Sequence, residues 1–143
     1  MSDAVTPAKP STPIELIWEH DLVFAGKSGG ITMTLDSAAT AGPSPMQALA
    51  FALAGCMAMD VVHVLTKGRD DLRGLRVDLT GTRAGEEPRR FMSIALHYSI
   101  TGEVPPARVE RAIELSREKY CSVWHSMRQD IELSVTFKVT PGV

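Results

Sequence analysis

The sequence predicts a single α+β domain with antiparallel sheets, a long central helix and a second, amphipathic helix. Two observations lead to this class. Apolar and polar residues alternate with a period of two in several short segments, which is typical of half-buried strands. Residues 46–65 form one long apolar run that is better suited to a core helix. Because strands and helices are segregated along the chain, an α+β arrangement is favoured over a parallel α/β one.

The first third of the chain predicts an antiparallel meander. Residues 1–13 contain three prolines among small polar residues and are expected to be disordered, which leaves one domain over residues 14–143. Short strands are expected at 14–18 and 22–24. A third strand, at 31–35, alternates apolar residues with threonines and follows a Gly-Gly turn.

The central helix is expected to run from Pro45 to about Thr66, with Ser44 as its N-cap. It is apolar on nearly every face and must therefore be enclosed by protein. One domain of this size offers few places to enclose it, so a second subunit could supply the missing cover. The length of this helix would suit a membrane span. Its middle, however, is rich in Ala and Gly, and three polar residues interrupt it: Gln47, Asp60 and His63. We therefore expect no membrane association.

The second half predicts a hairpin, a helix and a closing strand. Alternation at 75–79 and at 94–100 indicates two paired strands with one wet face. A helix opens at Pro105-Pro106 and carries an apolar stripe at three- and four-residue spacing, with a break near Cys121-Ser122. Residues 131–139 alternate again and predict the last strand.

Composition excludes several classes of protein. The 143 residues carry a formal net charge of -2 and a pI of about 6.1, which recruits neither nucleic acid nor an anionic membrane. Two cysteines do not make a disulfide scaffold. The first 13 residues lack the basic start and apolar segment of a signal peptide, so a cytoplasmic location is expected. No Gly-rich phosphate loop is found.

The two cysteines are the candidate reactive groups. Cys56 lies well inside the apolar helix, where the ordinary interpretation is a small buried hydrophobic residue. Burial raises the pKa of a thiol, so a reactive cysteine there needs a cation from elsewhere in the fold. Cys121 lies beside the apolar stripe of the second helix. Contact between them is plausible, but the sequence alone cannot bring them within disulfide distance.

Other arrangements of these residues were weighed. Cys121 and His125, four apart, and Cys56 and His63, seven apart, can each share a helix face. Neither spacing matches a zinc motif, and no metal is expected. A nucleophilic pair of Cys121 with His125 stays open. Asp60 needs a partner in its apolar helix, either a backbone segment that it caps or an arginine across an interface.

Two motifs resemble those of the OsmC/Ohr family. Residues 42–47 read Gly-Pro-Ser-Pro-Met-Gln and residues 54–62 read Ala-Gly-Cys-Met-Ala-Met-Asp-Val-Val, which is similar to the central-helix signature of that family. Residues 109–116 and 119–123 resemble its second signature. The likeness covers roughly residues 16–139 and is closest to the less characterised OsmC-like branch.

The resemblance implies an intertwined homodimer with each central helix buried between the subunits. It also implies a thiol peroxidase that uses no cofactor and reduces organic hydroperoxides or hydrogen peroxide. Cys56 would attack the peroxide oxygen as a thiolate, Cys121 would resolve the sulfenic acid, and a dithiol would reduce the resulting disulfide.

The sequence departs from the well-studied members at the groups that activate the thiol. Those members keep a glutamate ten residues before the reactive cysteine, where this chain has Met46. They also use an arginine from the N-terminal part, whereas residues 1–68 contain none. The substitutes that we consider are Lys27, Arg117 and Arg128. The alternative function is a non-enzymatic dimer of the same fold that binds a small apolar ligand or responds to redox state.

Overall fold

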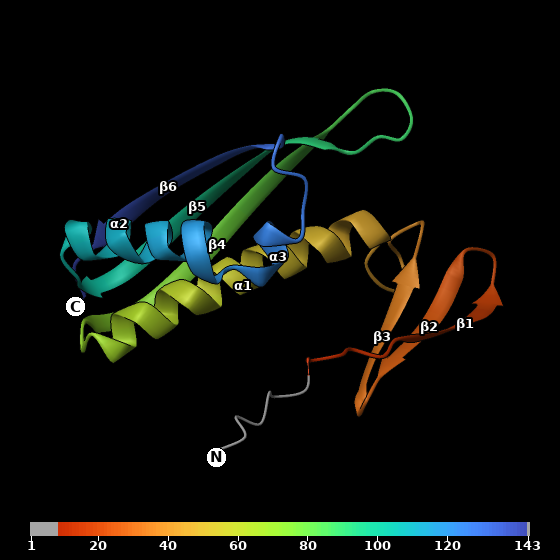
Figure 1. Ribbon diagram of the computed structural model, residues 1–143, viewed down its shortest axis with the longest axis horizontal. Coiled ribbons are helices and arrows are strands. Elements are labelled where there is room, and N and C mark those ends of the chain that lie inside the picture. The colour runs from red at the N-terminus through yellow and green to blue at the C-terminus, as the bar shows by residue number, and fades with distance from the viewer. Residues whose placement is uncertain (1–8, 143) are drawn as a thin grey trace, which may run out of the picture. The chain divides into compact units, whose positions relative to one another are not determined.

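The computed structural model describes residues 9–142, which fall into two compact units, Met1–Ala48 and Leu49–Val143. Of the segment expected to be disordered, residues 1–8 lie outside the described residues. Residues 9–14 are exposed and have no regular secondary structure. The order of helices and strands is the expected one (Figure 1). The single domain over residues 14–143 stays a prediction, and the two units are described separately below.

The first unit contains a three-stranded antiparallel meander, as the sequence predicts. Its strands are β1 (Glu15–His20), β2 (Val23–Ser28) and β3 (Ile31–Asp36), paired in the order β1-β2-β3. Gly29 takes a positive φ of 58° in the turn between β2 and β3, which suits a residue without a Cβ atom. Several large apolar side chains of this sheet are exposed in the single chain, among them Leu16, Ile17, Trp18, Ile31 and Met33.

Asp36 organises the loop that leads from β3 to the central helix. Its buried carboxylate accepts hydrogen bonds from the backbone N–H groups of Ala38 at 2.9 Å, Thr40 at 3.2 Å and Ala41 at 2.9 Å. The amides of Ala41 and Ala38 are the main cause that lowers the pKa of Asp36 below its ordinary value. The ionised carboxylate therefore holds the loop in one conformation.

The central helix α1 (Pro45–Lys67) begins where the sequence places it. Ser44 and Gln47 form a reciprocal cap, in which the Gln47 N–H donates to Ser44 Oγ at 3.2 Å and the Ser44 N–H donates to Gln47 Oε1 at 3.0 Å. Gln47 therefore fixes the start of the helix. After Lys67 the chain turns sharply, with Arg69 at a positive φ of 60°.

The second unit is built on the sheet of β4 (Asp71–Arg83), β5 (Phe91–Glu103) and β6 (Glu132–Thr140), in the order β4-β5-β6. The hairpin of β4 and β5 is antiparallel, as expected, but β6 pairs with β5 in parallel. Antiparallel pairing thus holds for only part of this sheet. The reason is the helical segment between β5 and β6, which returns the chain to the start of β5, so that β6 runs in the same direction.

The second helix breaks where the sequence suggests. The α2 helix (Pro106–Leu115) continues into a π-helical turn, η1 (Ser116–Tyr120). Cys121 then adopts extended backbone angles, φ −73° and ψ 97°, and the short helix α3 (Ser122–His125) follows. Because of this break, Cys121 lies between two helical segments and is the N-cap residue of α3.

One face of the second sheet packs against the helices to form the core. Figure 1 shows α1 and α2 alongside this sheet. Alternate residues of β5 are buried, as the period of two predicts, and α1 contributes a stripe at four-residue spacing. The core residues of β5 are Ile94, Leu96, Tyr98 and Ile100, and those of α1 are Leu53, Met57, Val61 and Leu65.

The single chain buries only this one stripe of α1. Phe51 and Met59, on its other faces, are each 72% exposed. By length and composition α1 is apolar enough to cross a membrane, and 22% of its most apolar window is buried in the chain. The complete enclosure that the sequence predicts therefore needs cover from outside the single chain.

The pKa of Asp36 predicts how the stability of the fold depends on pH. A carboxyl group whose pKa is lowered in the folded state contributes stability that is fully present above its ordinary value of 3.8. That contribution disappears as the pH falls through the folded-state pKa. We expect Asp36→Asn to be less stable than the wild-type protein at pH 7, with the difference shrinking below pH 3.8.

Urea unfolding at a series of pH values measures this difference. Glu110→Gln, which removes a carboxylate at an exposed position of α2, is the control and should track the wild type closely. A deficit of Asp36→Asn that stays constant down to the acid limit would contradict the role of the ionised carboxylate.

Candidate functional site

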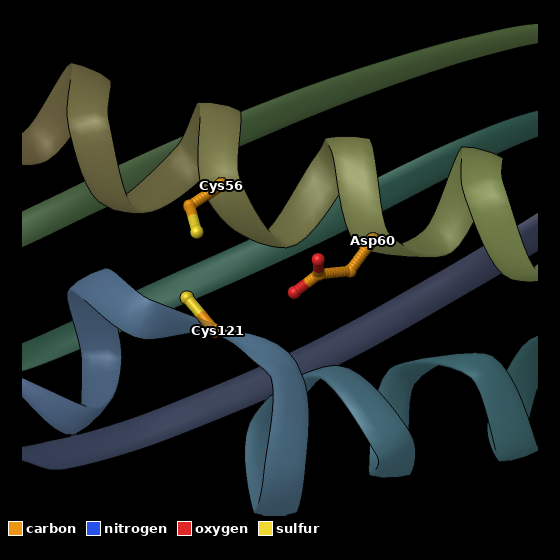
Figure 2. Close-up of side chains that lie close together, drawn as sticks. All are labelled: Cys56, Asp60 and Cys121. Carbon is orange, nitrogen blue, oxygen red and sulfur yellow. The ribbon is translucent and has the colours of Figure 1, made fainter. Parts of the chain in front are cut away.

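Two thiols and a carboxylate meet between α1 and the break in the second helix. Cys56 and Asp60 are four residues apart and therefore share one face of α1. The sulfur atoms of Cys56 and Cys121 and a carboxylate oxygen of Asp60 all lie within 4.8 Å of one another. Figure 2 shows the two sulfur atoms pointing toward each other, with Asp60 beside them. Both cysteines are free thiols.

The π-helical turn determines the position of Cys121. The backbone N–H of Cys121 donates to the carbonyl oxygen of Ser116, five residues earlier, at 2.8 Å. Its Sγ then accepts a hydrogen bond from the Trp124 N–H at 3.3 Å and so caps α3. The side chain is completely buried. π-helical turns are rare in proteins, and those that do occur are often found at functional sites.

Burial is the main cause that raises the pKa of the Cys121 thiol, to about 11. The Trp124 N–H favours the thiolate and opposes this shift, whereas the neighbouring Cys56 thiol and the charge of Asp60 add to it. Cys121 therefore keeps its proton at neutral pH. Cys56 is more accessible, being only partly buried.

Asp60 finds its partner in the second helix. The buried Ser116 hydroxyl donates to Asp60 Oδ2 at 2.8 Å. This partner is neither a capped backbone segment nor an arginine, the two possibilities raised by the sequence. The same serine therefore orients the carboxylate through its hydroxyl and positions Cys121 through its carbonyl oxygen.

Tyr98 adds a fourth polar group at this site. Its side chain is completely buried on β5, and its hydroxyl has no hydrogen-bond partner among the described residues. Burial raises the pKa of Tyr98, and the charges of Cys121, Asp60 and Cys56 raise it further, so the phenol stays neutral. The sequence indicated only a core strand here. The available signal was a single tyrosine on an otherwise aliphatic buried face.

A cavity of about 610 Å³ lies along α1 next to the site. Asp60 belongs both to its lining and to the cluster with the two thiols, whereas neither cysteine lines it. Its other lining residues mix apolar and cationic groups and include His63, Lys67, Leu115 and Tyr120. This mixture suits a small organic molecule that carries a polar group.

The remaining candidates from the sequence lie elsewhere or have other partners. His63 lines the cavity, and His125 Nε2 lies 3.0 Å from the carbonyl oxygen of Arg117, so neither histidine belongs to the cluster of three. Arg128 forms two hydrogen bonds with Asp130, at 2.9 and 2.6 Å. Lys27 lies in the first unit. The main causes of the pKa shift of Cys121 are its burial, the Trp124 N–H, the Cys56 thiol and Asp60, and none of these is a lysine or arginine.

Comparison with known proteins gives consistent matches. The family model described as OsmC-like protein matches residues 35–136. The chain is 39% identical to Protein YhfA of Escherichia coli strain K12 over 125 residues, which cover 85% of this chain and 93% of that protein.

Solved structures share the fold. A hypothetical protein of Aquifex aeolicus superimposes with a TM-score of 0.87 at 27% identity, over 94% of this chain and all of that one. An organic hydroperoxide resistance protein OsmC of Legionella pneumophila gives a TM-score of 0.70 at 16% identity, over 93% of this chain and 100% of that one. The second likeness, at its low identity, concerns the fold alone.

The distance between the sulfur atoms predicts a disulfide in the folded protein. We expect hydrogen peroxide to join Cys56 and Cys121 of one chain without unfolding it, because their sulfur atoms already lie within 4.8 Å of each other in the folded chain. Intact mass should show the loss of two hydrogen atoms, and peptide mapping should find the crosslinked pair. Cys121→Ser is the control and cannot form this link. Separate overoxidation of the two cysteines in the wild type, with no crosslink, would contradict the prediction.

Proposed function

This chain belongs to the OsmC-like protein family, and on that premise we propose that it is a thiol-dependent peroxidase that reduces organic hydroperoxides or hydrogen peroxide. The observation that carries the proposal is the convergence of two free thiols within 4.8 Å in a chain that has only these two cysteines. Among the structures that share the fold, that of Legionella pneumophila is named an organic hydroperoxide resistance protein.

The proposed cycle begins at Cys56. Its thiolate attacks the terminal peroxide oxygen, so that an S–O bond forms, the O–O bond breaks and the leaving alkoxide takes a proton to become an alcohol. The sulfur is then a sulfenic acid. The Cys121 sulfur attacks it, forming the S–S bond and releasing water. An external dithiol then reduces the disulfide by exchange.

Exposure supports this division of roles. Cys56 is partly exposed, so a peroxide can reach it, whereas Cys121 is completely buried. A buried position suits the second step because the target of Cys121 is the sulfur beside it rather than a molecule from solution. The Cys121 thiol loses its proton as it attacks, and that proton leaves with the released water. The cavity along α1 is lined by Asp60, the carboxylate that lies beside the two sulfur atoms.

A homodimer is part of the proposal. The exposed residues Phe51 and Met59 leave much of α1 uncovered in the single chain. The β1–β3 sheet likewise carries an apolar groove, lined by Ile14, Leu16, Ile31, Met33 and Leu35 among others. A second copy of the chain would cover these surfaces. The cytoplasmic location expected from the sequence stays a prediction.

A second function has support in the sequence, because the chain lacks the glutamate and the N-terminal arginine that activate the thiol in well-studied members: position 46 is Met and residues 1–68 contain no arginine. A thiolate usually needs a nearby positive charge. Without one, the chain would be a non-enzymatic dimer that binds a small apolar ligand or responds to redox state. Peroxide-dependent turnover with a dithiol reductant distinguishes the two functions, because only the peroxidase consumes both.

Two cysteine variants test the roles of the thiols. We expect Cys56→Ser to abolish peroxide consumption, because no nucleophile remains for the first step. Cys121→Ser should react once and stop at a sulfenic acid that a dimedone-type probe traps. Peroxide consumption and mass spectrometry of the labelled peptide measure both outcomes. If Cys56→Ser consumes peroxide at the wild-type rate, the assignment of roles is wrong.

The uncovered surfaces predict an obligate dimer. Obligate interfaces typically bury more than about 2,000 Å² in total, and a charge placed in one is strongly unfavourable. We expect light scattering at micromolar concentration to give the mass of two chains for the wild type and a smaller species for Met59→Glu. Glu110→Gln, exposed on α2, should stay dimeric. A monodisperse wild-type monomer would overturn the prediction.

A further inference from the structure

The cluster of Cys56, Asp60 and Cys121 has the composition of a metal site. Two thiolates and a carboxylate are all ligands of zinc in proteins. We propose that these three residues, when both thiols are reduced, bind one thiophilic divalent metal ion, with Zn²⁺ as the best match. The site shares its two sulfur atoms with the proposed peroxidase, but metal binding does not require peroxidase activity.

The separations of the ligand atoms fit this ion. Zinc bonds to sulfur at about 2.3 Å and to carboxylate oxygen at about 2.0–2.2 Å, so the ligands of a tetrahedral site lie roughly 3.3–3.8 Å apart. The three ligand atoms here already lie within 4.8 Å of one another. Rotations of the side chains close the remaining gap. Cys56 and Asp60 come from one helix face and Cys121 from a separate segment, so the ion would be held from two sides.

A hydrogen bond already orients the carboxylate ligand. The Ser116 hydroxyl donates to Asp60 Oδ2 at 2.8 Å, and Ser116 is itself completely buried. Metal-binding carboxylates are usually held in this way by a neighbouring donor, which fixes the direction of their lone pairs. Asp60 is thus oriented toward the thiols before any ion arrives.

The Tyr98 hydroxyl supplies an independent observation. Its side chain is completely buried, and the hydroxyl has no hydrogen-bond partner among the described residues. Buried polar groups rarely lack a partner, and each exception needs an explanation. Three protein ligands leave the fourth position of a tetrahedral ion to a water molecule. The phenol can donate to that water or to a metal-bound oxygen.

The ligand set also explains why the sequence alone did not indicate a metal site. The spacings weighed there paired cysteine with histidine, and neither His63 nor His125 is part of the cluster. The third ligand is a carboxylate, which joins the thiols only in the folded chain. Two sulfur ligands disfavour Mg²⁺ and Ca²⁺, which prefer oxygen.

Metal binding and disulfide formation exclude each other, because both use the two sulfur atoms. Oxidation of the metal-bound form by a hydroperoxide is balanced when the two thiolates give up two electrons to form the S–S bond. The peroxide takes up those electrons and two protons to become an alcohol and water, and the divalent ion leaves unchanged. The reduced protein would bind the ion and the disulfide form would not.

Titration of the reduced protein with Co²⁺ tests the site, because a cobalt–thiolate bond gives intense charge-transfer absorption in the near ultraviolet. We expect saturation at one ion per chain and displacement by Zn²⁺. Cys56→Ser and Cys121→Ser should each weaken this absorption, and Asp60→Asn should lower the affinity at least about tenfold. Ser116→Ala should lower it by roughly 10- to 100-fold. Asp78→Asn makes the same change as Asp60→Asn at an exposed position on β4 and should leave the affinity unchanged.

A second measurement uses only the wild-type protein, in case the variants fold poorly. Zn²⁺ should protect both Cys56 and Cys121 from alkylation in the reduced protein, and the disulfide form should show no cobalt–thiolate absorption. Absence of that absorption in the reduced wild type would overturn the proposal. Unchanged affinity in well-folded Asp60→Asn would do the same. Neither result depends on whether the protein turns over peroxide.

Discussion

The candidate site depends on Ser116, which connects the two segments that carry the cysteines. Its hydroxyl holds Asp60 of α1 at 2.8 Å, and its carbonyl oxygen accepts from the Cys121 N–H across the π-helical turn at 2.8 Å. A regular α-helix would pair that carbonyl with residue 120 and would turn Cys121 away from its present direction. The irregular turn is thus the structural cause of the approach of the two thiols, and the buried serine stabilises it from both ends.

The environment of the thiols is acidic and largely dry. Cys121 is completely buried beside a second thiol and a carboxylate, and among the main influences on its pKa within residues 9–142, the Trp124 N–H alone favours the ionised form. Such surroundings favour neutral thiols or thiolates neutralised by a cation. The peroxidase and metal-binding proposals meet this requirement in different ways. The peroxidase needs a positively charged group near Cys56, whereas in the metal site the bound ion itself supplies the positive charge.

Local features of the sequence predicted most of the fold. The Ser44 N-cap and the alternation of β5 are encoded within a few residues, and both are confirmed, whereas the reciprocal bond from Gln47 was first seen in the structure. The parallel pairing of β6 was not predictable, because it depends on the path of the chain between β5 and β6. The candidate site shows the same contrast between features encoded locally and contacts between distant residues. Cys56 and Cys121 stood out as single residues, whereas the bond between Asp60 and Ser116 joins positions 56 apart. Sequence periodicity and local spacing cannot predict a contact between residues so far apart in the chain.

The sulfur atom of Cys121 also serves as the N-terminal cap of α3, since it accepts the Trp124 N–H at 3.3 Å. When Cys121 enters a disulfide, its sulfur atom must shift toward Cys56 and therefore away from its position as acceptor of the Trp124 N–H. The first turn of α3 would then loosen when the thiols are oxidised. The Trp124 side chain lies in that turn and is 5% exposed, whereas Trp18 is 65% exposed. The buried indole is therefore an intrinsic fluorophore whose emission would follow the redox state of the neighbouring thiols, with no label attached.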